Sequence, residues 1–222
     1  MISPNEIIRT NRNSIALTIN EKGDLIVRAP YQMPVEKIYD FIKEKQKWIE
    51  KKQSFIKTTL SENKDITEYN SMFFIGKKYP IQLVKGLDQA ILTNDHLAIP
   101  FTNNINIKKH NLKTFLCLKI EQIIMPKISK FARKIGVSPM SVKIISSKAK
   151  WGMCDSKSNI YFNFKLAMLS NEMIDYVIIH ELCHIKHLNH SKEFWKEVER
   201  FMSNYKDSIN MLKKSDFLIK LF

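Results

Sequence analysis

Residues 170–201, SNEMIDYVIIHELCHIKHLNHSKEFWKEVERF, contain the pattern that decides the fold of this chain. Apolar residues fill the first half of the stretch, and Ser170 is a suitable N-cap, so the sequence predicts a buried helix from Glu172 to Ile185. His180 and His184 stand four residues apart and therefore share one face of that helix. Two imidazole nitrogens can meet at a single metal ion on this face.

Glu181 completes an H-E-x-x-H pattern with the two histidines. In this arrangement zinc holds a water molecule and the glutamate takes its proton. A surface helix with solvated histidines would carry the same letters. The apolar surroundings argue against that alternative, because burying two histidines and a carboxylate without a partner is costly. We expect a zinc site with Glu181 as its catalytic residue.

A catalytic zinc takes three protein ligands, so a third must be found. His187 shares the face of His180, but seven residues of helix separate the two by about 10 Å. Zinc ligand atoms must lie about 3–3.5 Å apart, so the third ligand must come from a chain that has turned back. Asn189 tolerates the left-handed conformation that ends helices and directly precedes His190. We expect His190 to be the third metal ligand and His187 to lie at the rim or behind the ligands.

The residues after His190 predict a second helix, which begins near Ser191 and continues through Phe201. This helix offers the alternative third ligand, because carboxylates also bind zinc. Glu193 and Glu197 are the two candidates for it.

The residues of this stretch resemble those of the YgjP-like family of predicted zinc metallopeptidases, which is related to the WLM and SprT-like groups. The resemblance covers about residues 15–215 and is strongest from Gly136 onward. It implies a zincin-like α+β fold, one Zn²⁺ per chain and a hydrolase that acts on peptides. The zinc ligands that it implies are His180, His184 and His190, and Glu181 would be the catalytic acid/base.

A second block of sequence agrees with the same family. It reads KWGMC at residues 150–154 and is followed by NFKL at residues 163–166. Lys150, Met153 and Phe164 replace the arginine, serine and tryptophan that are typical of the family at these places. The departures lie outside the metal motif. Trp151 is more often a packing residue than a substrate platform, and we expect it to fill the core.

Composition indicates a globular cytoplasmic enzyme. The 222 residues are enough for a substantial core, and the first residues contain no apolar segment of the kind that begins a secretory signal. No stretch of about 18 apolar residues is present, so we expect no membrane association. The three cysteines, at positions 117, 154 and 183, are odd in number and form no C-x-x-C pair, which predicts reduced thiols. We expect Cys183 to be a small core residue.

A formal net charge of +14 makes nucleic acid or a nucleotide a candidate partner, besides a peptide or protein substrate. The lysines are spread along the chain, and no arginine-rich motif gathers them. A general excess of lysine explains the charge equally well.

The order of predicted elements is α+β, with a β-rich N-terminal part at residues 1–105 and a zinc-binding catalytic part at residues 106–222, although the two could form one continuous domain. In the first part, hairpins are expected at residues 14–29, 72–84 and 90–101, together with one long helix that Pro34 opens. His96 falls on a turn and is expected to be solvated.

In the second part a helix from Lys108 is expected to bend or break at Pro126 and to stop at Gly136. Strands are expected at residues 142–146 and 159–163. The resemblance implies that the strand near Tyr161 is an edge strand, which could pair with an extended substrate.

Together these patterns predict a zinc-dependent hydrolase, most simply a metallopeptidase. One alternative is a hydrolase of nucleotide phosphoanhydride bonds, which fits the charge but would lack a phosphate-binding glycine loop. The other is a DNA-associated protease of the SprT or WLM type, which a basic groove leading to the zinc would favour.

Overall fold

The computed structural model describes residues 2–222 and has a mixed α+β fold, as predicted. The chain forms two compact units, of which the first ends at Lys64 and the second spans Asp65–Phe222. Each unit has a hydrophobic core of its own. No helix among the described residues is both long enough and apolar enough to cross a bilayer.

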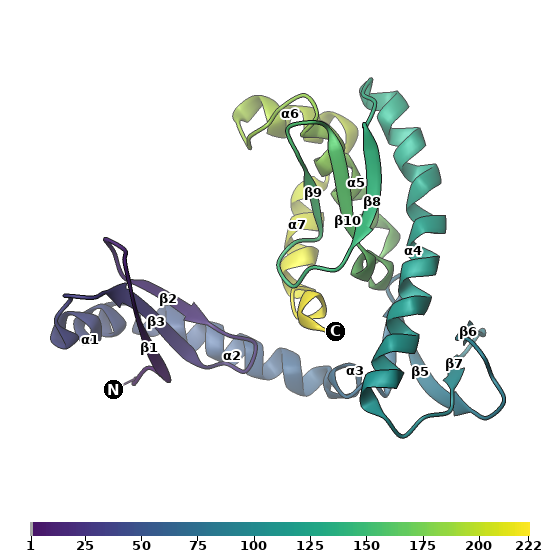
Figure 1. Ribbon diagram of the computed structural model, residues 1–222. Coiled ribbons are helices and arrows are strands. Elements are labelled where there is room, and N and C mark those ends of the chain that lie inside the picture. Colours follow the sequence, from purple (N-terminus) through teal and green to yellow (C-terminus); the bar gives the residue numbers. More distant parts are fainter. Residues whose placement is uncertain (1) are drawn as a thin grey trace. The chain divides into compact units, whose positions relative to one another are not determined.

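The first unit is a three-stranded sheet with two helices (Figure 1). The predicted hairpin is present, because β2 and β3 pair antiparallel, and β1 pairs parallel to β3 on its other side. Alternate residues of β3 are buried, which directs one face of the sheet into the core. The elements are β1 (Glu6–Thr10), β2 (Ala16–Ile19), β3 (Leu25–Pro30), α1 (Val35–Glu44) and α2 (Gln46–Glu62).

The single long helix predicted after Pro34 is two helices. α1 follows Pro34, as expected, but Lys45 leaves the helical conformation with φ −93° and ψ 9°, and α2 begins at the next residue. Ile42 in α1 and Ile49 in the first turn of α2 are both fully buried in the core of this unit. The change of direction at Lys45 lets both helices contribute to that one small core.

The second unit begins within the short helix α3 (Lys64–Thr67), which is followed by a four-stranded sheet in the order β4-β5-β7-β6. Both predicted hairpins are present. The turn between β4 and β5 uses Ile75 and Gly76 with positive φ, which a two-residue hairpin loop requires. The strands are β4 (Ser71–Phe74), β5 (Lys77–Val84), β6 (Ile91–Leu92) and β7 (Leu97–Pro100).

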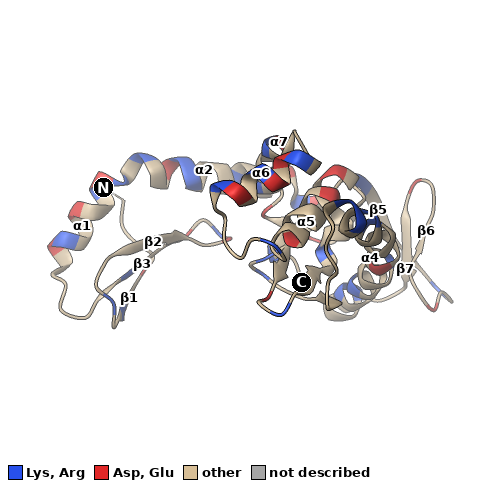
Figure 2. Ribbon diagram, turned by 90° about the horizontal axis from the view of Figure 1, so that it is seen from above, with Lys and Arg blue, Asp and Glu red and all other residues tan. Residues whose placement is uncertain are grey.

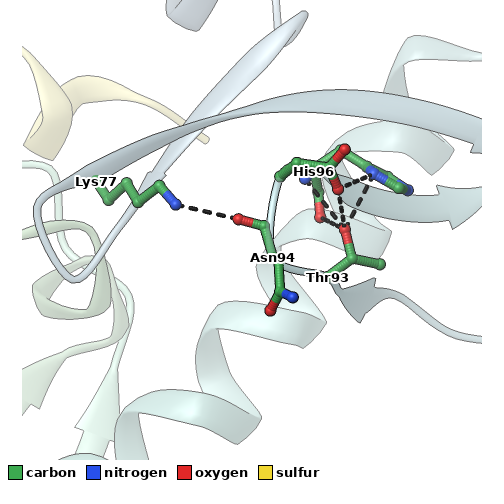
Figure 3. A network of polar contacts seen from close by, with 5 residues as sticks. Lys77, Thr93, Asn94 and His96 are labelled. Atoms are coloured by element: carbon green, nitrogen blue, oxygen red, sulfur yellow. Dashed lines mark hydrogen bonds and ion pairs between the residues drawn. The ribbon is translucent and has the colours of Figure 1, made fainter.

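His96 lies in the turn between β6 and β7, but it is less solvated than expected. Its side chain is only 21% exposed, and its Nδ1 lies 2.8 Å from an Asp95 carboxylate oxygen and 3.0 Å from the Thr93 hydroxyl. Figure 3 shows this network, in which Lys77 from β5 also donates a hydrogen bond of 3.1 Å to the Asn94 carbonyl. These contacts give the histidine a structural role in closing the turn.

This sheet shares its core with α4 (Ile105–Ile135). Leu97 and Ile99 of β7 are fully buried in the same cluster as Leu112 of α4. The division between the compact units therefore falls between Lys64 and Asp65, earlier in the chain than the predicted boundary near residue 105.

α4 is a continuous helix of 31 residues, and Pro126 does not break it. The side chain of Asn104 caps its start by accepting from two backbone N–H groups, and Gly136 ends it with a left-handed φ of 75°. Ile124 and Ile128, on either side of Pro126, are both buried. Packing on both sides of the proline therefore holds the helix together.

The rest of the second unit contains a three-stranded sheet in the order β8-β10-β9 and the helices that follow it. Figure 1 shows α5 behind these strands, with α4 to one side and α7 to the other. The elements are β8 (Ser141–Ile145), β9 (Gly152–Cys154), β10 (Asn159–Asn163), the 3₁₀ helix η1 (Phe164–Met168), α5 (Asn171–Cys183), α6 (Lys192–Phe201), α7 (Tyr205–Lys214) and the 3₁₀ helix η2 (Leu218–Lys220).

The strand that contains Tyr161 is central, so the expectation of an edge strand there is wrong. β10 pairs parallel to β8 on one side and antiparallel to β9 on the other. β9 forms from Gly152 to Cys154, which were expected to lie in or beside a loop. The free edge nearest α5 therefore belongs to β9.

Candidate metal centre and active site

α5 is the buried helix that the sequence predicts. The Ser170 side chain accepts a hydrogen bond from the backbone N–H of Met173, and Glu172 places negative charge in the first turn. The helix packs against α4, α6, α7 and β9. Its last residue is Cys183, which is fully buried as expected, so His184 lies immediately after the helix.

The structure brings together three of the predicted residues, His180, His184 and His190. The Nε2 atom of His180 lies 3.2 Å from that of His184 and 3.1 Å from that of His190. His180 is in the last turn of α5, and His190 lies in the turn before α6. Asn189 does not adopt a positive φ, so the chain reverses without the expected left-handed residue.

The arrangement of these nitrogens fits a zinc ion. Two ligands at zinc–nitrogen distances near 2.0 Å and tetrahedral angles are separated by about 3.3 Å. The two observed separations, 3.1 and 3.2 Å, agree with this value. Three imidazoles with room for a fourth ligand are also the donor set of catalytic zinc sites.

The carboxylates considered as alternative ligands are not part of the cluster of three histidines. Glu197 pairs with Lys186 at 2.9 Å, and Glu193 is exposed in the first turn of α6. α6 nevertheless begins where the sequence predicts, because the Ser191 side chain accepts a hydrogen bond from the backbone N–H of Phe194.

Polar groups at the Nδ1 atoms of His180 and His184 orient these two imidazole rings. The His187 carbonyl lies 2.9 Å from Nδ1 of His184, and because a carbonyl only accepts, that nitrogen must carry the proton. This leaves Nε2 of His184 free for a metal. The Tyr176 hydroxyl lies 3.3 Å from Nδ1 of His180. His187 therefore supports the site through its backbone, consistent with a place behind the ligands.

Two aromatic residues of α6 pack on the histidine rings. Phe194 stacks on His184 with ring centroids 4.5 Å apart, and Trp195 stacks on His190 at 5.6 Å. The sequence predicts a helix through both aromatics but not their contacts with the histidines. Their packing restricts the rotation of rings that a metal would need in fixed positions.

Burial favours the neutral form of His180 and His184 in the metal-free chain. Desolvation, together with the neighbouring His184 and His190, lowers the pKa of His180 to about 3. Desolvation also lowers the pKa of His184. A neutral imidazole retains the lone pair that binds a metal, so both rings are ready to act as ligands near neutral pH.

Glu181 is almost completely buried beside β9, with 6% of its surface exposed. Desolvation raises its pKa to about 8, while the charge of Lys150 and a hydrogen bond from the Cys154 backbone N–H act in the opposite direction. Gly152 provides the space for this side chain. A Cβ atom at residue 152 would lie 2.7 Å from Cγ and 2.8 Å from Oε1 of Glu181.

A cavity of about 210 Å³ opens beside Glu181 and His180. Trp151 lines this cavity and also packs against the core of the unit, so it fulfils the expected packing role and borders the site as well. Its indole Nε1 is buried, and no residue in the described part of the chain forms a hydrogen bond with it. The walls come from the segment that leads into β9, from α5 and from α7: Lys150, Trp151, Gly152, Tyr176, Val177, His180, Glu181 and Leu212.

The segment before β9 is anchored by a buried side chain for which the sequence predicts no role. The Asn163 amide, which is fully buried, donates hydrogen bonds to the carbonyls of Ser147 at 2.8 Å and Lys150 at 2.9 Å. Only its position in the second sequence block could have drawn attention to it. Asn163 thereby fixes the segment that carries the cavity wall.

Comparison with known proteins identifies the family of this chain. The family described as "YgjP-like, metallopeptidase domain" matches residues 13–215. No curated protein sequence matches the chain. The crystal structure of the metallopeptidase zymogen abylysin of Pyrococcus abyssi is a similar solved structure, with 22% sequence identity and a TM-score of 0.39 over 41% of this chain and 93% of that one. Because the family match covers most of the sequence, the chain belongs to the YgjP-like metallopeptidase family.

Proposed function

We propose that this protein is a zinc metallopeptidase in which His180, His184 and His190 hold one zinc ion and Glu181 is the general base. The observation that carries the proposal is the convergence of three imidazole nitrogens, with separations of 3.1 and 3.2 Å, next to a buried glutamate. Zinc, when bound, supplies Lewis acidity that lowers the pKa of water toward neutrality.

Glu181 would move the protons of the reaction. Its carboxylate accepts a proton from the attacking water and later donates that proton to the nitrogen of the leaving amine. Gly152 leaves space for the carboxylate, and the Cys154 N–H holds it by a hydrogen bond on one side. In the metal-free chain the pKa of Glu181 is raised to about 8. The positive charge of a metal bound nearby would lower this pKa and so favour the ionised, proton-accepting form of Glu181.

An extended peptide could bind along the free edge of β9. In an antiparallel ladder, main-chain groups alternate between the partner strand and the opposite side. Met153 pairs with Tyr161 of β10, and the adjacent hydrogen bonds join Trp151 to Asn163 and Asp155 to Asn159. The main-chain groups of Gly152 and Cys154 therefore point away from β10, and the Cys154 N–H forms a hydrogen bond with Glu181.

Pairing with this edge would bring a peptide bond of the substrate to the base. Main-chain hydrogen bonds give affinity with little dependence on sequence. The cavity beside Glu181 could then receive a substrate side chain.

Two other functions are less well supported by the features of the molecule. A nucleotide hydrolase needs several phosphate-binding groups, whereas the cavity beside Glu181 contains Lys150 and no glycine-rich loop. A DNA-associated protease would be favoured by a basic groove that leads to the histidines. Figure 2 instead shows Lys and Arg distributed over many helices and interspersed with Asp and Glu.

A substrate panel tests the proposal. An unstructured protein, a nucleoside triphosphate, and single-stranded DNA with and without bound protein would each be incubated with wild type and Glu181→Gln at low and high salt. We expect wild type to cleave the unstructured protein, with little effect of salt on binding, and Glu181→Gln to be inactive. Triphosphate hydrolysis without proteolysis would overturn the proposal in favour of a nucleotide hydrolase, and proteolysis only in the presence of DNA would favour a DNA-associated protease.

A further inference from the structure

Peptide hydrolysis creates negative charge on the carbonyl oxygen, which a side chain other than the base can stabilise in addition to a bound metal. When water attacks the peptide carbon, the electron pair of the C=O double bond moves onto the oxygen, and a preorganised positive group near that oxygen lowers the barrier. The lining of the cavity beside Glu181 and His180 therefore decides which residue could serve.

Few of the lining side chains can donate to a substrate oxygen. The Tyr176 hydroxyl is within hydrogen-bond distance of His180, and the indole Nε1 of Trp151 is buried. Val177 and Leu212 are apolar. Among residues 2–222, Lys150 is the one lysine or arginine that lines the cavity.

The surroundings of Lys150 leave its charge available. Its backbone is fixed at both ends, because its N–H donates to the Ser147 hydroxyl at 3.1 Å and its carbonyl accepts from the Asn163 amide at 2.9 Å. Its side chain is exposed, and the ammonium group contacts only a weak acceptor, the Met153 sulfur, at 3.6 Å. Within residues 2–222 no carboxylate forms an ion pair with Lys150. An anchored backbone, with an ammonium that forms no ion pair among these residues, suits a side chain that stabilises negative charge on a substrate.

We propose that Lys150 is a further catalytic residue, whose ammonium group donates a hydrogen bond to the carbonyl oxygen of the peptide bond under attack. This rests on the proposed peptidase function. The water oxygen bonds to the carbon, and Lys150 stabilises the charge on the carbonyl oxygen without giving up a proton. When the C–N bond breaks, its electron pair stays on the nitrogen, which takes the proton that Glu181 holds, and the carbonyl re-forms.

A role of Lys150 in substrate binding alone would change different kinetic constants. If Lys150 only attracted acidic substrates, its loss would raise KM and leave kcat unchanged. A residue that acts on the transition state lowers kcat instead.

Three variants separate these roles. Lys150→Met removes the charge, Lys150→Arg keeps it, and Lys148→Met is the matched control, because Lys148 is an exposed lysine in the same segment that does not line the cavity. We expect Lys150→Met to lower kcat by about 10²–10³-fold, as for other single oxyanion donors, with zinc content and KM nearly unchanged. Lys150→Arg should recover most of the rate, and Lys148→Met should match wild type. A kcat for Lys150→Met equal to that of wild type would overturn the proposal.

A binding measurement gives a readout that does not depend on turnover. In the inactive Glu181→Gln background, affinity would be measured for a peptide and for its phosphonamidate analogue, whose tetrahedral centre carries a negative charge. We expect Lys150→Met to weaken phosphonamidate binding by about 100-fold or more and peptide binding little. Equal effects on both ligands, or none on either, would overturn the role of Lys150. Absence of peptide cleavage and of peptide binding by wild type would instead contradict the peptidase function.

Discussion

Glu181 shows how a single residue at this site depends on its neighbours. The H-E-x-x-H pattern places the carboxylate beside two histidines, but the pattern does not predict what holds it in place. In the structure that support comes from Gly152 and from the N–H of Cys154, about thirty positions earlier in the chain. A glycine is required at residue 152 because a Cβ atom there would meet Glu181.

Gly152→Ala should therefore impair catalysis while leaving the metal in place. The added Cβ would lie 2.7–2.8 Å from the Glu181 side chain, so the carboxylate must move. We expect at least a ten-fold loss of kcat, or about 1.4 kcal/mol of transition-state stabilisation, with one zinc still bound. Kinetic assays and elemental analysis would test this. Unchanged activity would show that the site accommodates the added Cβ without displacing the carboxylate from its active position.

The burial of Glu181 and His180 predicts how the stability of the metal-free protein varies with pH. The pKa of Glu181 is raised from 4.5 to about 8, so its protonated form stabilises the folded state below pH 4.5, and this contribution is lost as the pH rises through 8. The pKa of His180 is lowered from 6.5 to about 3, so stability increases with pH between these values. The two effects oppose each other between pH 4.5 and 6.5, and a decline remains from 6.5 to 8.

Urea unfolding in the presence of a chelator would measure this decline. Glu181→Gln cannot titrate, so the decline between pH 6.5 and 8 should be smaller in this variant than in wild type. Parallel pH profiles for the two proteins would contradict the assignment of the decline to Glu181.

At the scale of elements, local signals predicted the helix of the metal site well. Ser170 and Ser191 cap α5 and α6 as the sequence indicates, because their side chains act within a few residues. The pairing of β9 with β10 was not predictable in the same way. β9 has only three residues, and Met153 becomes part of a strand because Tyr161 lies opposite it. Because the sequence does not predict β9, the strand that contains Tyr161 was wrongly expected to be an edge strand.

Asn163 links the sheet to the cavity, so its loss should affect stability and activity together. Asn163→Ala removes the side-chain donor of the Lys150 carbonyl and the acceptor of the Lys165 N–H, while the Ser147 carbonyl keeps a hydrogen bond from Lys165 Nζ. We expect a loss of about 2–3 kcal/mol in the free energy of unfolding. Asn104→Ala, which removes the exposed cap of α4, should cost about 1 kcal/mol and leave activity unchanged. Urea unfolding and kinetic assays of both variants would test the comparison, and similar effects for the two would argue against a special role of Asn163.

At the scale of the whole molecule, the two compact units have separate cores. The core of the first unit includes Leu25, Ile38 and Ile49, and that of the second begins at Ile66. Sequence periodicity identified most strands and helices on both sides of this division. It could not locate the division itself, because the strands from Ser71 to Pro100 show no local sign that they pack on α4. Likewise, the break between α1 and α2 at Lys45 depends on the packing of both helices into the core of the first unit, which local sequence does not reveal.

Removal of the metal should therefore destabilise one unit only. A ligand that binds only the folded state of a unit stabilises that unit. We expect calorimetry to show two transitions, of which a chelator lowers only that of the second unit. Ile38→Ala, in the core of the first unit, should lower the other transition and leave zinc content unchanged. A single transition that both changes lower would show that the units unfold together.

Zinc content measured by elemental analysis tests the central claim most directly. His190→Ala removes a proposed ligand, whereas His187→Ala is a matched control, because His187 supports His184 through a backbone carbonyl that alanine retains. The expected result is one zinc per chain in wild type and in His187→Ala, and a large loss in His190→Ala. Full zinc content in His190→Ala, or loss only in His187→Ala, would contradict the metal centre described above.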